Sequence, residues 1–179
     1  MIDQAFYLFG LPKNVIADIR LQRPHAKTDD NFELNLDYGF LKVILKSGML
    51  VREPGPRYMI HGTKGSFLKY GEDPQEVFLR AGKLPTEVEN WGCEPQEIFG
   101  LLHTETNGEI IKEKYPSHKG DFGFYYQNLY KTIRENAPLR EKPEHSYNTI
   151  RLIELAAESN YKKIPIACND LINIAYPNN

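Results

Sequence analysis

The stretch NFELNLDYGFLKVIL (residues 31–45) alternates apolar and polar side chains, and this alternation determines the predicted fold. In its first half, Phe32, Leu34 and Leu36 fall on one side of an extended chain, and charged or amide residues fall on the other. Residues 14–22 repeat the pattern. Because side chains of a strand alternate between the two faces of a sheet, the sequence predicts amphipathic antiparallel strands with one face on the core.

Two turn signals add further strands. Gly62-Thr63-Lys64-Gly65 is interpreted as a hairpin turn, and Asn107-Gly108 is the stronger signal because both residues accept a positive φ. The strands that these turns would join are residues 57–61 with 66–70 and residues 98–103 with 110–114. We expect the first hairpin to continue the sheet. Residues 164–167 contain Pro165, which favours a place at the sheet edge.

Helical spacing accounts for most of the remaining chain. The predicted helices are residues 2–9, 74–81, 121–136 and 144–160. Asp73 is expected to cap the second of these helices and Asp121 the third. The side chains expected to form apolar stripes on the two long helices are Phe122, Tyr126, Leu129 and Ile133 on the first and Ile150, Ile153 and Ala157 on the second. Two such helices suffice to cover one face of a sheet. The sequence therefore predicts an α+β fold in a single domain of residues 1–179: an open-faced, mostly antiparallel β-sheet with helices packed on one face.

Composition excludes several classes of protein. Lys plus Arg is 22 and Asp plus Glu is 24, so the formal net charge of −2 argues against a nucleic-acid partner. No run of 18 apolar residues occurs, so we expect no membrane-spanning helix. The two cysteines, Cys93 and Cys168, are too few for a disulfide framework and favour a reducing, cytoplasmic compartment.

Familiar catalytic motifs are absent from the sequence. It contains no G-x-G-x-x-G nucleotide fingerprint, no H-E-x-x-H metal motif and no G-x-S-x-G nucleophile elbow. His61 has no acidic neighbour in sequence, which favours a structural histidine over a general base. The sequence thus predicts neither a catalytic residue nor a metal site within this chain.

Two segments are candidate binding regions, VREPGPRY (residues 51–58) and YPSHKGDFGFYY (residues 115–126). Arg and Asp side chains hydrogen-bond hydroxyl groups, and aromatic rings pack on the apolar faces of sugars. The alternative for each segment, left open at this point, is a solvated loop and a helix cap beside core aromatics. The residues predicted to bind substrate are Arg52, Arg57, Tyr58, Lys119, Asp121 and Phe122.

Several blocks together resemble the C-terminal half of Gfo/Idh/MocA-type oxidoreductases, the relatives of glucose–fructose oxidoreductase and inositol dehydrogenase. These blocks are IDQAFYLFGLPKNVIAD (2–18), HAKTDD (25–30), HGTKGSF (61–67), KYGEDPQE (69–76) and Gly120-Asp121-Phe122 with Tyr125. The resemblance implies an antiparallel sheet domain that binds a sugar or polyol and forms the homodimer through its open face. It also implies that both candidate segments lie where relatives contact substrate.

The rest of that family's pattern does not occur in this sequence. The resemblance implies a preceding nucleotide-binding domain with a glycine fingerprint, a catalytic E-K-P lysine and an Asp/His pair, after which Met1 would follow. Glu141-Lys142-Pro143 spells E-K-P but falls in the wrong domain. The helix at residues 2–9 has no capping residue before it, which fits either a short uncapped first helix or a chain cut from a longer one, and the second interpretation is favoured.

We therefore expect the substrate-binding and dimerisation domain of an NAD(P)-dependent sugar or polyol dehydrogenase. It should be inactive alone and bind no cofactor, with NAD or NADP belonging to the full-length enzyme. The alternative is a stand-alone carbohydrate-binding or assembly module derived from such an enzyme. Ile16, Phe40 and Ile44 share the predicted outer face of the sheet with charged residues, and such a mixed face suits an isologous dimer.

Overall fold

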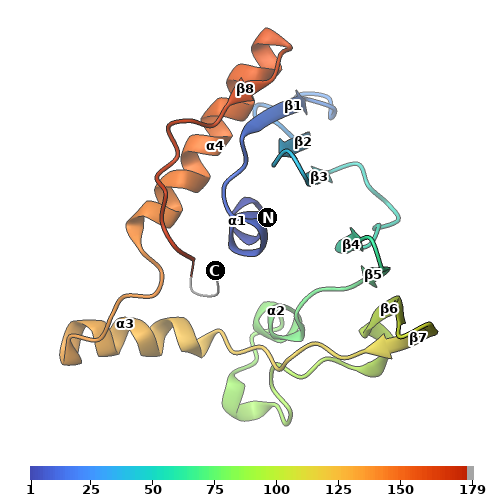
Figure 1. Ribbon diagram of the computed structural model, residues 1–179. Coiled ribbons are helices and arrows are strands. Elements are labelled where there is room, and N and C mark those ends of the chain that lie inside the picture. The colour runs from blue at the N-terminus through green and yellow to red at the C-terminus, as the bar shows by residue number, and fades with distance from the viewer. Residues whose placement is uncertain (177–179) are drawn as a thin grey trace. The chain divides into compact units, whose positions relative to one another are not determined.

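The computed structural model describes residues 1–176, which divide into two compact units (Figure 1). The first unit contains Met1–Arg52 together with the chain from Asn136 onward, and the second contains Glu53–Glu135. Each unit contains a four-stranded antiparallel sheet. The predicted α+β class with antiparallel sheets is confirmed, and the single domain 1–179 stays a prediction.

The first sheet has the strand order β3-β2-β1-β8. Its strands are β1 (Asn14–Arg20), β2 (Asn31–Asp37), β3 (Lys42–Gly48) and β8 (Ile166–Ala167). The alternating stretch at residues 31–45 forms β2 and most of β3, in the register that places Leu34 opposite Ala17 and Leu45. Strand β8 pairs only with β1 and lies at the sheet edge, as Pro165 predicted.

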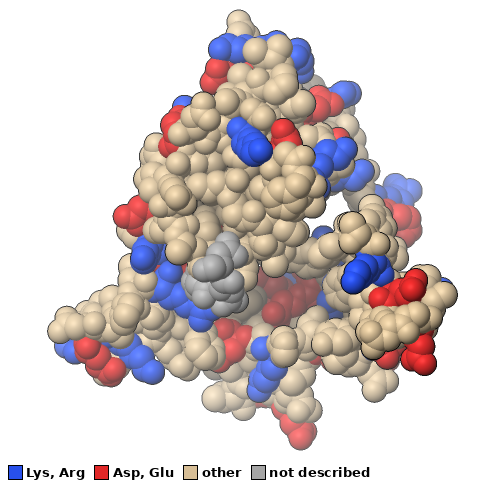
Figure 2. Space-filling view, in the orientation of Figure 1, with Lys and Arg blue, Asp and Glu red and all other residues tan. Residues whose placement is uncertain are grey.

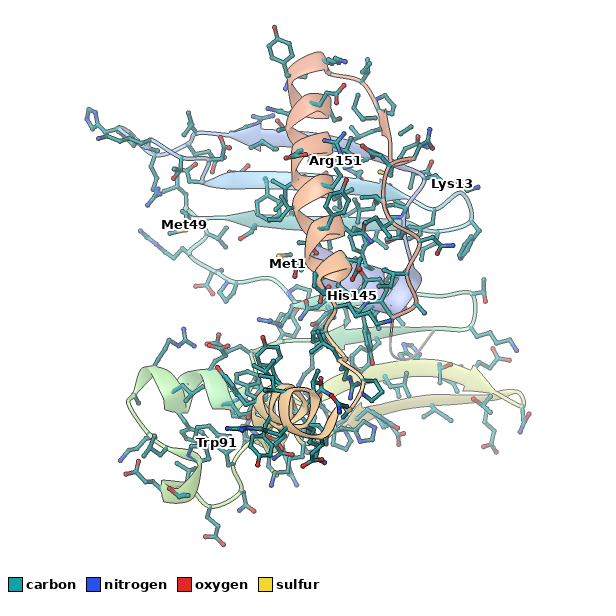
Figure 3. The ribbon with its side chains drawn as sticks, turned by 90° about the vertical axis from the view of Figure 1, so that its left-hand side faces the viewer. Met1, Lys13, Met49, Trp91, His145 and Arg151 are labelled. Atoms are coloured by element: carbon teal, nitrogen blue, oxygen red, sulfur yellow. The ribbon has the colours of Figure 1, made fainter. Side chains whose placement is uncertain are left out.

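The core of the first unit lies between this sheet and two helices. These are α1 (Ile2–Phe9) and α4 (Pro143–Lys162), and Figure 3 shows α4 lying across the strands. The buried apolar side chains include Phe6, Val15, Ala17, Leu34, Leu36, Leu45, Leu152, Leu155 and Ala156. Full burial of one large aliphatic or aromatic side chain contributes about 1.5–3 kcal/mol, so this cluster supplies the main stabilisation of the unit.

The predicted inner face of α4 is wrong. Ile150 and Ile153 are 58% and 48% exposed, and Ala157 is exposed as well. The buried positions are His145, Asn148, Leu152, Leu155, Ala156 and Ser159. Three of these six residues are polar, so a search for apolar spacing selected a different face of the helix.

The polar residues of α4 are buried because they bind backbone that lacks strand partners. Strand β8 is two residues long and pairs with β1 only at residues 14 and 15. Farther along β1, Ala17 N donates to Ser159 Oγ at 3.1 Å, and Ile19 N donates to Asn160 Oδ1 at 3.0 Å. Side chains of α4 thus continue the sheet edge where β8 stops.

The second unit has the strand order β4-β5-β6-β7. Its elements are β4 (Tyr58–His61), β5 (Gly65–Lys69), α2 (Pro74–Arg80), the short 3₁₀ helices η1 (Pro85–Glu87) and η2 (Gln96–Ile98), β6 (Gly100–Thr106), β7 (Glu109–Tyr115) and α3 (Gly123–Glu135). Both predicted hairpin turns are confirmed. Gly62 N donates to Gly65 O at 2.8 Å, and Asn107 and Gly108 have φ of 55° and 82°.

The hairpin β4–β5 differs from expectation because it belongs to a second sheet and does not continue the first. Pro54 and Pro56 lie in the segment between β3 and β4. Because proline has no backbone N–H, it cannot donate a hydrogen bond to a neighbouring strand, and this segment is poorly suited to extending the first sheet.

The predicted apolar stripe of α3 is not buried. Phe122, Tyr126 and Ile133 are exposed, Leu129 is half-buried, and no residue of α3 is buried. Helical spacing reports which side chains share a face, and it does not report whether anything covers that face. The predicted inward-facing stripe is therefore not found on α3, whereas α4 packs on the sheet of its own unit.

The charged side chains visible in Figure 2 are interspersed, with Lys and Arg beside Asp and Glu. Among the helices of residues 1–176, none is long and apolar enough to cross a bilayer.

Asn148 provides a test of how the first unit is held together. Its side chain is fully buried, donates from Nδ2 to Ile172 O at 2.9 Å and accepts at Oδ1 from Ile172 N at 2.8 Å. We expect Asn148→Ala to lower the free energy of unfolding by about 2–4 kcal/mol, because two backbone groups lose their partner.

Urea unfolding followed by circular dichroism measures this change. Thr149→Ala is the matched control, since the Thr149 hydroxyl returns to His145 O within the same helix. Its effect should stay within about 0.5 kcal/mol. Equal effects of the two substitutions would contradict the assigned role of Asn148.

Candidate functional site

The six predicted substrate-binding residues fall in both units. Arg52 ends a stretch of the first unit, whereas the other five belong to the second. Arg52 and Arg57 are exposed, and Tyr58 is half-buried at the start of β4. Lys119, Asp121 and Phe122 lie in one short segment of the second unit.

We call Ser117–Phe122 the 117–122 segment, and it connects β7 to α3. Other elements of the second unit bind its backbone at three points. Ser117 N donates to Glu94 Oε1 at 2.7 Å, Gly120 N donates to Gly92 O at 2.9 Å, and Phe122 N donates to Gln75 Oε1 at 3.0 Å. The side chains of His118, Lys119 and Asp121 are nevertheless exposed. A fixed backbone that presents exposed polar side chains is typical of a binding loop.

Gln75 holds the end of the segment near α3. Its side chain is fully buried, and its Nε2 lies 3.1 Å from each carboxylate oxygen of Asp73. Its Oε1 accepts from Phe122 N and, at 2.9 Å, from Trp91 Nε1. Because the amide faces a carboxylate on one side and two donors on the other, its orientation is fixed.

Asp73 connects this arrangement to α2. Its side chain accepts from Gln75 N at 2.9 Å, as expected for the predicted helix cap, and Pro74 is the first helical residue. A Cβ on Gly120 would overlap the Asp73 carboxylate and the Gln75 amide, so only glycine fits at this point of the segment.

Glu94 holds the opposite end of the segment. Lys69 Nζ donates to Glu94 Oε2 and to Ile98 O, and the two ion-pair side chains are only 11% and 8% exposed. Burial opposes ionisation of Glu94, but hydrogen bonds from Lys69 and Ser117 outweigh it, so the pKa of this carboxyl lies below its ordinary value. Glu94 is therefore an ionised acceptor for Ser117 N at neutral pH.

Trp91 lies in the loop between α2 and β6 and packs that loop against α2. Its ring stacks on Phe78 of α2 with centroids 5.6 Å apart, and Figure 3 labels its position. Gly92 follows with a φ of +76° and accepts from Gly120 through its carbonyl oxygen.

Lys69, Gln75 and Glu94 were missed by the sequence-based site prediction. Lys69 and Gln75 do fall inside KYGEDPQE, the block that carried much of the family resemblance. Their place in that block is the one sequence signal that pointed toward them. Their partners lie 25 and 47 residues away, where spacing carries no information.

The segment has the chemistry to bind hydroxyl groups. The Lys119 ammonium is a donor, the Asp121 carboxylate is an acceptor, and the Phe122 ring offers an apolar surface. Asp121 also accepts from Gly123 N at 2.8 Å, which caps α3 as predicted.

Groups for redox or nucleophilic chemistry are not assembled here. Burial raises the pKa of the Cys168 thiol to about 11, so it stays protonated, and Cys93 is exposed. No cluster of three metal-ligating side chains occurs in residues 1–176. His61 is exposed with Nδ1 2.8 Å from Ser66 Oγ in the hairpin, which agrees with a structural role.

The described residues do not fit a nicotinamide dinucleotide. A dinucleotide fold places the pyrophosphate at a helix N-terminus between parallel strands. Every strand pair described in residues 1–176 is antiparallel.

The family model described as "Oxidoreductase family, C-terminal alpha/beta domain" matches residues 1–167. The chain belongs to the Gfo/Idh/MocA oxidoreductase family, within its C-terminal domain. The sequence-based resemblance is thereby confirmed.

Individual relatives agree with this assignment. The scyllo-inositol 2-dehydrogenase (NADP(+)) IolW of Bacillus subtilis (strain 168) is 45% identical over 163 residues, which cover 91% of this chain and 45% of that protein. The "Uncharacterized oxidoreductase YhhX" of Escherichia coli (strain K12) is 38% identical over 158 residues, covering 88% of this chain and 45% of that protein. The chain thus spans somewhat under half the length of these two relatives.

Solved structures show the same fold. The Bacillus subtilis protein yvaA has a TM-score of 0.87 and 44% identity, over 93% of this chain and 48% of that one. A Bacteroides fragilis protein has a TM-score of 0.85 and 42% identity, over 93% of this chain and 50% of that one.

Two glycine substitutions test the contact between the Trp91 loop and the segment. Gly82 and Gly92 both have positive φ, +72° and +76°, but a Cβ on Gly82 meets nothing within 4 Å, whereas one on Gly92 overlaps Gly120 O. Gly82→Ala should cost about 1–2 kcal/mol from φ alone. Gly92→Ala should cost at least about 1 kcal/mol more, by analogy with other forced overlaps in packed sites.

Thermal and urea unfolding of the two variants, followed by the fluorescence of the chain's single tryptophan, measure the difference. Equal destabilisation would mean that the 117–122 segment does not pack on Gly92 in solution.

Proposed function

We propose that this chain is the substrate-binding and dimerisation domain of an NAD(P)-dependent dehydrogenase that acts on a sugar or polyol. One observation carries the proposal: the 117–122 segment has a fixed backbone and exposed hydroxyl-binding side chains. Family membership and the 45% identity to a scyllo-inositol 2-dehydrogenase support a cyclic polyol as substrate.

The proposed division of chemistry follows from what alcohol oxidation needs. The reaction requires a hydride acceptor and a base for the hydroxyl proton, both held close to the reacting carbon. We assign both to a separate nucleotide-binding part of the enzyme, so this chain alone should neither turn over a polyol nor bind NAD or NADP.

The residues of this chain orient the substrate in the proposal. Lys119 donates to one substrate hydroxyl, Asp121 accepts from another, and Phe122 packs against the apolar face of the ring. Arg52, Arg57 and Tyr58 are each proposed as further substrate contacts, on the strength of the family resemblance.

The homodimer is proposed to form through the outer face of the first sheet. Ile16 and Ile44 lie on either side of Asn35 in one cross-strand row, and each is 47% exposed. The neighbouring row of Asp18, Glu33 and Lys46 carries both signs of charge. A two-fold axis would bring each apolar row against its copy and pair opposite charges around it.

A hybrid enzyme tests the catalytic proposal. In this hybrid, the chain replaces the part of the Bacillus subtilis scyllo-inositol 2-dehydrogenase that it matches. We expect the hybrid to reduce NADP⁺ with scyllo-inositol, followed by absorbance of NADPH, and the chain alone to show no activity. An inactive hybrid, together with polyol binding by the chain alone, would favour the stand-alone module.

Variants of the hybrid locate the substrate site. Lys119→Ala and Asp121→Asn should each raise the KM for scyllo-inositol about tenfold, the effect of losing a charged hydrogen bond. The KM for NADP⁺ should not change, and Asp121→Asn should keep the melting temperature because Asn also caps a helix. Lys112→Ala, an exposed lysine on β7, is the control. An unchanged KM for scyllo-inositol in both variants would place the substrate elsewhere.

Sedimentation of the chain tests the dimer. The wild type should sediment as a dimer at micromolar concentration, and Ile44→Glu should give a folded monomer because it places charge in the apolar row. Val77→Glu, an equally exposed apolar position on α2, should remain dimeric. A monomeric wild type at high concentration would contradict the proposed interface.

A further inference from the structure

Two buried side chains of the second unit accept hydrogen bonds from the backbone of an exposed segment. The Gln75 side chain is fully buried and the Glu94 side chain nearly so, yet an oxygen of each accepts a hydrogen bond from a backbone N–H of the 117–122 segment. Ser117 itself is exposed, so water could satisfy its N–H without help from a carboxylate. The bond from Ser117 to Glu94 is therefore not needed to solvate the amide, and its consequence is to fix where the segment lies.

The positions of these bonds match the positions of the proposed binding residues. The bound amides belong to Ser117, Gly120 and Phe122. Lys119 and Asp121 lie next to these bound amides, so their Cα positions are fixed while their side chains stay exposed. Ordering a loop before the ligand arrives removes an entropic cost from binding.

We propose that Gln75 and Glu94 are positioning residues, whose buried oxygens hold the two ends of the 117–122 segment so that Lys119 and Asp121 are placed for a polyol. This inference rests on the proposed function of the segment. Neither residue touches the substrate in the proposal, and the Lys69–Glu94 ion pair serves to keep the Glu94 carboxylate ionised and oriented.

A matched pair of double variants isolates the bond at Ser117. Lys69→Met/Glu94→Leu removes both the ion pair and the acceptor, whereas Lys69→Met/Glu94→Gln removes the ion pair but keeps an amide oxygen. Neutral replacement of a buried ion pair is often tolerated, because removal of both charges leaves none unpaired. The two double variants differ only at residue 94, where glutamine keeps a side-chain oxygen for Ser117 N and leucine does not.

A second pair isolates the bond at Phe122 and serves if the first pair does not fold. Gln75→Leu removes the acceptor of Phe122 N. Trp91→Phe removes the other donor to the same oxygen but leaves the Phe122 bond and an aromatic ring on Phe78. Both changes should lower stability, so stability alone does not distinguish positioning from packing.

Two measurements separate these roles. Amide hydrogen exchange at Ser117 and Phe122 is measured in the chain, and the KM for scyllo-inositol is measured in the hybrid enzyme. We expect Lys69→Met/Glu94→Leu and Gln75→Leu to speed exchange at the released amide at least tenfold and to raise this KM several-fold. The KM for NADP⁺ should stay constant, and Lys69→Met/Glu94→Gln and Trp91→Phe should resemble the wild type in both measurements.

Three results would overturn the inference. If exchange quickens but the KM for scyllo-inositol does not move, the bonds are structural only. If exchange does not quicken, the bonds do not hold the segment in solution. If Lys119→Ala and Asp121→Asn leave that KM unchanged, the proposed function of the segment fails first and the positioning role fails with it.

Discussion

The buried amide of Gln75 is the interaction on which the candidate site depends. Its Nε2 donates to the carboxylate of Asp73, and its Oε1 accepts from Trp91 Nε1 and Phe122 N. One side chain thereby joins the start of α2, the Trp91 loop and the 117–122 segment. Glutamine suits this position because it is donor and acceptor at once. Glutamate would set a second carboxylate against Asp73, and leucine would remove the acceptor shared by Trp91 Nε1 and Phe122 N.

In the first unit, polar side chains also bind backbone groups, but there these bonds complete a sheet. Polar side chains on α4, buried at Asn148 and Ser159 and half-buried at Asn160, bind backbone groups of Ala17, Ile19 and Ile172. A longer β8 would make Ser159 and Asn160 unnecessary, and an apolar α4 would leave those groups unpaired in a dry environment. Polar groups of a helix therefore complete the edge of the first sheet, while apolar groups of the same helix form its core.

The chain belongs to the Gfo/Idh/MocA oxidoreductase family, within its C-terminal domain, and it spans somewhat under half the length of its curated relatives IolW and YhhX. In the proposed function, this half supplies substrate recognition and leaves hydride transfer to a nucleotide-binding half. Such a division lets the loop that selects the substrate be held by its own local network. The part that binds the cofactor need not contribute to that network.

Local patterns in the sequence determined the strands, both hairpin turns, the caps at Asp73 and Asp121 and the edge position of β8, because each depends on residues close together in the chain. They also indicated residues 115–126, which include the 117–122 segment, as one of two candidate binding regions. Only the tertiary structure decided which face of α4 is buried, that the strands form two sheets, and that Lys69, Gln75 and Glu94 support the segment. The reason is physical: Lys69 reaches Glu94 across 25 residues and Gln75 reaches Phe122 across 47, and such pairings depend on how the chain returns on itself.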